Sequence, residues 1–244
     1  FSCHTVGDTF YENCAAVRCA SCGSCDVDFS QSKYVGCVFF ANTFEAGVCA
    51  YNSGSHVYVD CIISENAPFE QIWQGNETSL FFYNCLIEGN EKNAILRMND
   101  GLVNFRNCTI RGGKSLMVLM NDSMECLFQE NRMSLEVPES GDSSSTGRLF
   151  LENCLLENQK EFTLGLNGNA VRRAFFRGNF YLNSPGIAIS GKVLSGEAYF
   201  KAVSFDKGSS FTRNTPGEKL LNRYGQKADV GAKLPESVLA LYEK

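Results

Sequence analysis

The chain has 244 residues, of which 44% are hydrophobic and 20% are charged, an ordinary composition for a globular domain with a sizeable core. Its formal net charge of -5 gives no basic surface for displacing counterions, so no nucleic-acid partner is expected. The sequence contains no apolar run long enough to cross a bilayer, so no membrane span is expected in this segment.

The dominant feature of the sequence is a repeat of about 24 residues marked by cysteine. The reference positions are, in chain order, Cys14, Cys37, Cys61, Cys85, Cys108, Cys126, Cys154, Asn179 and Val203. An aromatic ring recurs three residues earlier, at Tyr11, Tyr34, Tyr58, Phe82, Phe105, Phe176 and Phe200. A loop rich in Ser and Gly at 138–147 lengthens one step. The spacing therefore predicts about nine coils.

A second column lies one residue before the reference, where Asn, Gly and Asp recur. Its members include Asn13, Gly36, Asp60, Asn84, Asn107, Asn153 and Gly178. These residue types tolerate the left-handed backbone conformation at low cost. A left-handed residue bends a strand, so the aromatic before it and the cysteine after it can both point inward.

A second turn is predicted five residues after the reference. Its residues are Asn42, Asn66, Asn90, Gly113, Asn131 and Gly208, with Asn158 or Asn183 one place early. A third apolar stretch recurs between the two turns, as at 48–50 and 116–120. The sequence therefore predicts three short strands in each coil.

These columns predict an all-β fold, a right-handed single-stranded parallel β-helix over residues 1–208. The bend ladder comprises Asn13, Asn84, Asn107 and Asn153, and the ladder of buried thiols comprises Cys37, Cys61, Cys85 and Cys108. The thiols are expected to act as small hydrophobes rather than as disulfides. A leucine-rich repeat is the competing fold, but leucine does not dominate the inward positions.

The motif F-x-N-C-x-I-x-x-N stands at Phe82 to Asn90 and is nearly repeated at Phe105 to Gly113. It resembles the large right-handed β-helix superfamily that includes pectate lyases, and is most similar to the repetitive polymorphic surface proteins of certain bacteria and protists. The resemblance covers residues 10 to about 208. It implies a way of packing and names no chemistry.

Cys19, Cys22 and Cys25 have the close spacing of a metal site or a redox pair. A metal ion could take Cys3 or Cys49 as its fourth ligand. The alternatives are disulfides among these five cysteines, or free thiols.

Three further residues are candidates for binding. Trp73 is the only tryptophan and is expected to face outward, where it could stack on a sugar or a protein, or pack under a loop. Asp100 and Asp122 lie in two Met-Asn-Asp triplets that should stack on one edge, where they could hold calcium or simply form turns.

The repeat ends near residue 208, and residues 209–244 form a polar tail. Leu234 to Tyr242 reads as a short helix with Pro235 near its start, which could be a cap, a dock for a partner or a frayed terminus. Further coils are expected to precede Phe1 in the full protein, because the amino end has no comparable cap.

The sequence holds only two histidines and no G-x-S-x-G motif, which excludes the common nucleophilic and zinc hydrolases. We therefore expect no catalytic residues and no cofactor. The leading hypothesis is a non-catalytic, adhesin-like module at the cell surface or outside the cell, with a protein or glycan partner. The alternatives are a polysaccharide-active lyase or hydrolase, and an intracellular scaffold within a larger assembly in the cytoplasm.

Overall fold

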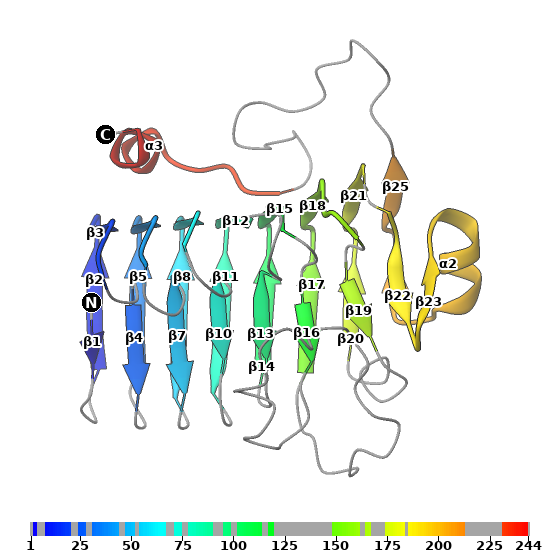
Figure 1. Cartoon of the computed structure of the whole chain (residues 1–244), viewed down its shortest axis with the longest axis horizontal. Coiled ribbons are helices and arrows are strands. Elements are labelled where there is room, and N and C mark those ends of the chain that lie inside the picture. The colour runs from blue at the N-terminus through cyan, green and yellow to red at the C-terminus, as the bar shows by residue number, and fades with distance from the viewer. Residues whose placement is uncertain are drawn as a thin grey trace.

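The chain folds into a parallel β-solenoid with three faces, built by strands that stack from one turn to the next (Figure 1). The computed structural model describes residues 2–3, 8–20, 24–27, 31–43, 47–51, 54–66, 71–74, 78–89, 95–98, 102–113, 117–119, 148–161, 164–166, 174–183, 185–212 and 231–243. Within these residues the only helices are α2 (Gly196–Ala202) and α3 (Glu236–Tyr242). The expected all-β parallel β-helix is confirmed.

Two sheets of eight strands run the length of the solenoid. Sheet B contains β2 (Asp8–Glu12), β5 (Gln31–Val35), β8 (Ser55–Val59), β11 (Ser79–Tyr83), β14 (Leu102–Arg106), β17 (Arg148–Glu152), β20 (Ala174–Arg177) and β24 (Asp206–Lys207). Sheet C contains β3 (Ala15–Val17), β6 (Val38–Phe40), β9 (Ile62–Ser64), β12 (Leu86–Gly89), β15 (Thr109–Gly112), β18 (Leu155–Glu157), β21 (Phe180–Leu182) and β25 (Ser210–Thr212).

The third face is divided between two sheets. Sheet A contains β1 (Ser2–Cys3), β4 (Ser24–Val27), β7 (Val48–Tyr51), β10 (Ile72–Gln74), β13 (Leu96–Met98) and β16 (Met117–Leu119). Sheet D contains β19 (Leu164–Leu166), β22 (Ile187–Ile189) and β23 (Lys192–Leu194), of which β22 and β23 are antiparallel.

The prediction of about nine coils is wrong, because the longest sheets stack eight strands. Strand β14 pairs directly with β17, so no strand of sheet B comes between Cys108 and Cys154. Cys126, the reference position of one predicted coil, lies outside the described residues.

The last coil also differs from the prediction. Val203 is the C-cap of α2, and Gly208 and Ser209 instead take the bend and reference positions. Helix α2 adds residues to this coil, so equal spacing fails there. The paired strands continue through β25, beyond residue 208.

The bend between sheets B and C has the predicted left-handed conformation. The backbone φ is positive at Asn13 (52°), Gly36 (63°), Asp60 (55°), Asn84 (55°), Asn107 (54°), Asn153 (55°), Gly178 (61°) and Gly208 (72°). On its two sides lie the inward columns. The rings of Tyr34 and Tyr58 stack with centroids 4.8 Å apart, and those of Tyr58 and Phe82 are 4.9 Å apart.

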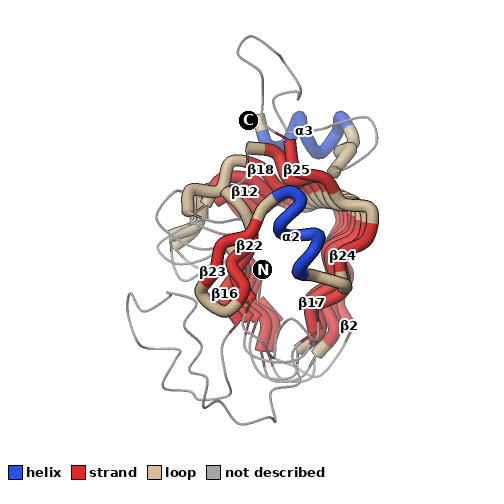
Figure 2. The backbone as a smooth tube through the Cα atoms, turned by 90° about the vertical axis from the view of Figure 1, so that its right-hand side faces the viewer, coloured by secondary structure: helices blue, strands red, loops and turns tan. Residues whose placement is uncertain are grey.

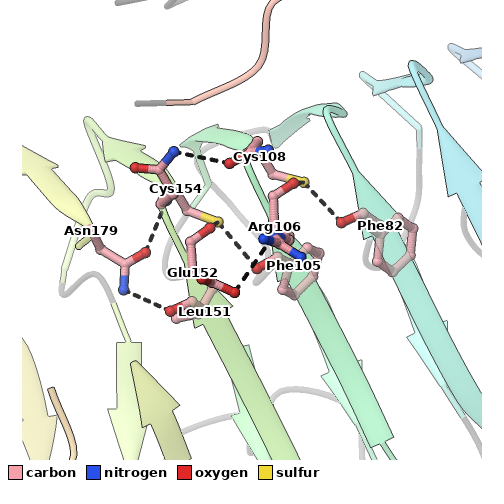
Figure 3. A network of polar contacts seen from close by, with 10 residues as sticks. Phe82, Phe105, Arg106, Cys108, Leu151, Glu152, Cys154 and Asn179 are labelled. Carbon is pink, nitrogen blue, oxygen red and sulfur yellow. Dashed lines mark hydrogen bonds and ion pairs between the residues drawn. The ribbon is translucent and has the colours of Figure 1, made fainter. Parts of the chain in front are cut away.

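The cysteines after the bend form a buried ladder. Cys37, Cys61, Cys85, Cys108 and Cys154 are fully buried free thiols, as predicted. Each thiol donates to backbone carbonyls; Cys108 Sγ lies 3.3 Å from the carbonyl oxygen of Phe82 and Cys154 Sγ lies 3.4 Å from that of Phe105 (Figure 3). Burial raises the pKa of Cys85 and of Cys154 well above the usual range, so these thiols stay protonated.

The second turn lies one residue earlier than predicted in the first three coils. The left-handed residues there include Arg18, Ala41 and Glu65, four positions after the reference, and Asn158 and Asn183 lie at this same early position, as predicted. The next residues, Asn42 and Asn66, are fully buried. Asn66 Oδ1 accepts from Asn42 Nδ2 at 2.9 Å, and Asn66 Nδ2 donates to the Phe39 carbonyl at 3.0 Å. They form an amide ladder between coils.

Helix α2 covers the carboxyl end of the core (Figure 2). Its Tyr199 is fully buried against Tyr181 and Phe211. The hydroxyls of Tyr181 and Tyr199 donate to Asp206 Oδ2 at 2.8 and 3.0 Å, which satisfies this buried carboxylate. The repeat in the sequence predicts an ordinary coil here, so this helix was not predicted.

Helix α3 lies along the side of the solenoid, over sheet C near the amino end, and does not cap an end (Figure 1). Residues 231–235 lead to it, and together they form what we call the C-terminal strap (231–243). Its apolar residues Ala232, Leu234 and Val238 form one cluster with Val38, Ile62 and Leu86 of sheet C. Asn84 holds the strap backbone through Lys233, accepting from its N–H at 2.6 Å and donating to its carbonyl at 2.9 Å.

We predict that Asn107→Ala lowers the free energy of unfolding by about 1–2 kcal/mol, because alanine in the left-handed region clashes with its own carbonyl. Asn107→Gly is the matched control: it loses the same side-chain bond from Asn153 Nδ2, yet adopts the bend freely. Urea unfolding of both variants measures the difference. Equal stability of the two variants would contradict a strained bend.

We predict that Tyr199→Ala destabilises the carboxyl end of the solenoid by about 3–5 kcal/mol, because it leaves a cavity under α2. Tyr199→Phe keeps the ring and loses one hydrogen bond to Asp206, so it should cost about 1 kcal/mol. Hydrogen exchange of β21 and β25 measures the local effect. Unchanged protection in Tyr199→Ala would show that α2 does not seal the core.

Candidate functional site

The outer face of sheet B carries a continuous row of side chains, which we call the aromatic row. Strand register aligns Phe10, Lys33, Val57, Phe81, Asn104, Phe150 and Phe175. Phe10 and Phe175, near the two ends, are 59% and 50% exposed. Phe81 is partly exposed between the buried Leu80 and Phe82. Four phenylalanines on one exposed sheet face form an apolar surface of the kind that marks interaction sites.

Two rings of this row stack on each other, and a third stacks with a neighbouring ring outside the row. The centroids of Phe150 and Phe175 are 4.7 Å apart with an interplanar angle of 12°, and Phe81 is stacked with Tyr83 at 6.5 Å. Lys33 Nζ lies 5.9 Å from the centroid of the Phe10 ring. Stacking covers one face of each ring, which leaves less ring face for a flat sugar and favours edge contacts with other side chains.

A second outward row borders the aromatic row, and we call it the flanking row. It consists of Glu12, Val35, Val59, Tyr83, Arg106, Glu152, Arg177 and Lys207. Arg106 and Glu152 pair at 3.6 Å in the middle (Figure 3). The exposed Glu12 therefore leaves an acidic amino end, and the exposed Arg177 and Lys207 leave a basic carboxyl end.

The outer face of sheet C carries a carboxylate row, formed by Glu88, Arg111 and Glu157 on successive strands. Arg111 Nε lies 3.1 Å from Glu88 Oε1. Glu88 Oε2 accepts from Ser64 Oγ at 2.9 Å and from the Tyr242 hydroxyl of the C-terminal strap at 3.3 Å. The strap therefore sits directly on this row.

Glu157 differs from Glu88 in its surroundings. It is 5% exposed, and its Oε2 has no hydrogen-bond partner. Burial raises the pKa of Glu157, and the Glu88 charge adds to this shift, while Arg111 opposes it. A pair of carboxyls, one of them with a raised pKa, is what a glycosidase uses, and two strand spacings separate Glu88 from Glu157 by roughly 10 Å. A polymer cannot reach a carboxyl buried to this degree, so the row fits a structural ion cluster better.

The structure describes only part of the predicted cysteine site. Cys19 is half-buried and its backbone N–H donates to Asn42 Oδ1 at 3.0 Å, and Cys49 is buried; neither forms the disulfide considered for it. The backbone of Cys25 in β4 pairs with Ser2 and Cys49, and Cys22 lies outside the described residues. No group of three metal-binding side chains occurs in the described part of the chain.

The other predicted binding residues give no site. Trp73 lies in β10, where its backbone pairs with Cys49 and Arg97, but its side chain is outside the described part. Asp100 and Asp122 also lie outside it.

Among the described residues, the ladder positions around Cys154 hold the coils together. Asn179, in the place of a cysteine, accepts from Cys154 N–H at 2.9 Å and donates to the Leu151 carbonyl at 3.0 Å (Figure 3).

The aromatic row was missed in the sequence, although a signal for it exists. Phe10, Phe81 and Phe175 each stand immediately before an inward aromatic of the column that was recognised. Alternation along a strand sends the second ring of such a doublet inward and the first outward.

No family model, no curated protein and no solved structure matches this chain. Neither helix in the described ranges is long and apolar enough to cross a membrane.

We predict that Glu157 makes stability depend on pH. Because burial raises the pKa of Glu157, its contribution to stability is complete below the unfolded-state pKa and is lost as pH rises through the folded-state pKa. Glu157→Gln should therefore melt higher than the wild type at neutral pH, and the two should converge in acid. Glu152→Gln, which changes an exposed carboxylate, is the control. A difference in melting temperature between wild type and Glu157→Gln that is the same in acid and at neutral pH would contradict the prediction.

Proposed function

We propose that this chain is a non-catalytic interaction module, a rigid rod that presents the aromatic row on sheet B to a macromolecular partner. One observation carries the proposal: four phenylalanines lie along one outer face, and those near its ends are 59% and 50% exposed. Large apolar side chains are stabilised by burial, so a row of them on the surface indicates a surface that becomes covered.

A protein partner suits the row better than a glycan does. Sugars bind aromatic residues through the open ring face, and the stack of Phe150 on Phe175 covers one face of each ring. Side chains of a protein can instead pack against ring edges and against Val57 between them. The long straight array of strands also favours an extended, shape-matched contact over a small-molecule pocket.

The location we propose is the cell surface or the extracellular space, in keeping with the resemblance to surface repeat proteins. We further propose that the solenoid is right-handed, since connections between parallel strands have that hand in nearly all proteins. Fully buried thiols such as Cys61 and Cys85 are shielded from oxidants, so the cysteine ladder is compatible with an oxidising compartment. An intracellular scaffold is the alternative location.

The second candidate function is a polysaccharide-active enzyme. The observation that favours it is the carboxylate row, in which Glu157 has a raised pKa and Glu88 is paired with Arg111. General acid and base catalysis by such a pair would need substrate contact with both carboxyls. The burial of Glu157 and the contact of Tyr242 with Glu88 argue against it.

The test of the proposed function is a turnover assay on uronic-acid and neutral polysaccharides with calcium present. We expect no release of reducing ends or unsaturated sugars by the wild type, because the row offers no accessible acid and base. Turnover by the wild type would contradict the proposal. The double variant Glu88→Gln, Glu157→Gln would then show whether the carboxylate row carries the activity.

A further inference from the structure

We propose that the partner of the aromatic row is a second copy of this chain, docked face to face on sheet B with the two rods antiparallel. This inference rests on the proposed function, because it takes the row to be an interaction surface. It is carried by the order of charges and rings along sheet B, which is complementary to itself when reversed.

The ring pattern is the first part of the argument. Strand β11 lies midway between β2 and β20 in the order of sheet B. A two-fold axis along β11 places Phe81 against Phe81 of the second copy, and Phe10 against Phe175 of the second copy. The same operation brings Lys33 of one copy to Phe150 of the other, where an ammonium can lie over a ring. Each exposed phenylalanine then meets either another ring or a cation.

The charges select the antiparallel orientation. The same two-fold axis sets the exposed Glu12 of one copy against the exposed Arg177 of the other, and the symmetric pair forms at the opposite end. If the two rods were parallel, the facing strands of the two copies would run in opposite directions. Glu12 would then meet Asp8 of the second copy. Opposite charges across an interface fix its register, whereas like charges oppose association.

The size of the surface sets the expected strength. The seven strands from β2 to β20 are spaced about 4.8 Å apart and are mostly five residues long, so they cover on the order of 550 Å² on each copy. The total of about 1,100 Å² is below the standard size of a stable interface. A weak dimer that dissociates on dilution is therefore expected.

The experiment is sedimentation velocity of the full chain over a wide range of concentrations. The wild type should change from monomer to dimer, with a dissociation constant in the micromolar range or weaker. Phe81→Asp places two carboxylates together on the symmetry axis and should weaken the dimer about a hundredfold. Val193→Asp changes an exposed apolar residue of sheet D, outside the row, and should leave association unchanged. Circular dichroism checks that each variant is folded.

Charge exchange makes the test specific for orientation. Glu12→Arg and Arg177→Glu should each weaken the dimer about tenfold, and the double variant should restore it, because the pair is re-formed with opposite polarity. A chain that stays monomeric at every concentration would overturn the inference. So would a dimer that ignores Phe81→Asp, or one whose charge exchange gives no rescue. Any of these results leaves the turnover assay as the separate test of the proposed function.

Discussion

The whole structure depends on one backbone constraint, the left-handed residue that joins each strand of sheet B to the following strand of sheet C. At Asn84 this residue has a φ of 55°, and it lets Phe82 and Cys85 both enter the core from positions three apart. Without it, one of the two side chains would face solvent. Recurrence of the same bend in successive coils aligns rings with rings and thiols with thiols, so every coil is a template for the next.

Where this constraint acts alone, the sequence predicts the structure well. Asn and Gly before the reference positions predicted the left-handed bends, and the aromatic and cysteine columns predicted the buried core residues. Prediction failed where another element interrupts the period. Helix α2 lies in the last coil, so the reference position there is Ser209 and not Val203. Strand β14 pairs directly with β17, so the coil predicted at Cys126 adds no strand to sheet B between them. Spacing cannot distinguish an extra coil from an insertion of the same length.

The candidate site was harder to predict because it is defined by side chains that leave the core. Periodicity identifies residues under the constraint of packing, and outward residues such as Phe81 or Asn104 are free of it. The buried amides show the reverse problem. Asn42 and Asn66 look like turn residues in the sequence, yet each binds the coil before it from inside. An exposed turn asparagine and a buried asparagine that binds the preceding coil look the same in the sequence. They can be distinguished only when the position of the neighbouring coil is known.

The C-terminal strap has a consequence for how the rod comes apart. A solenoid whose coils contact only their neighbours can fray from an end, one coil after another. The strap contacts several coils, including some that do not contact one another. Its hydrogen bonds reach Asn153, Thr109 and Asn84, and its helix packs on β6 and β9. Coils that are distant along the rod are therefore tied by a single segment. The middle of the rod should melt as one cooperative block, with stepwise loss confined to the coils that the strap does not cross.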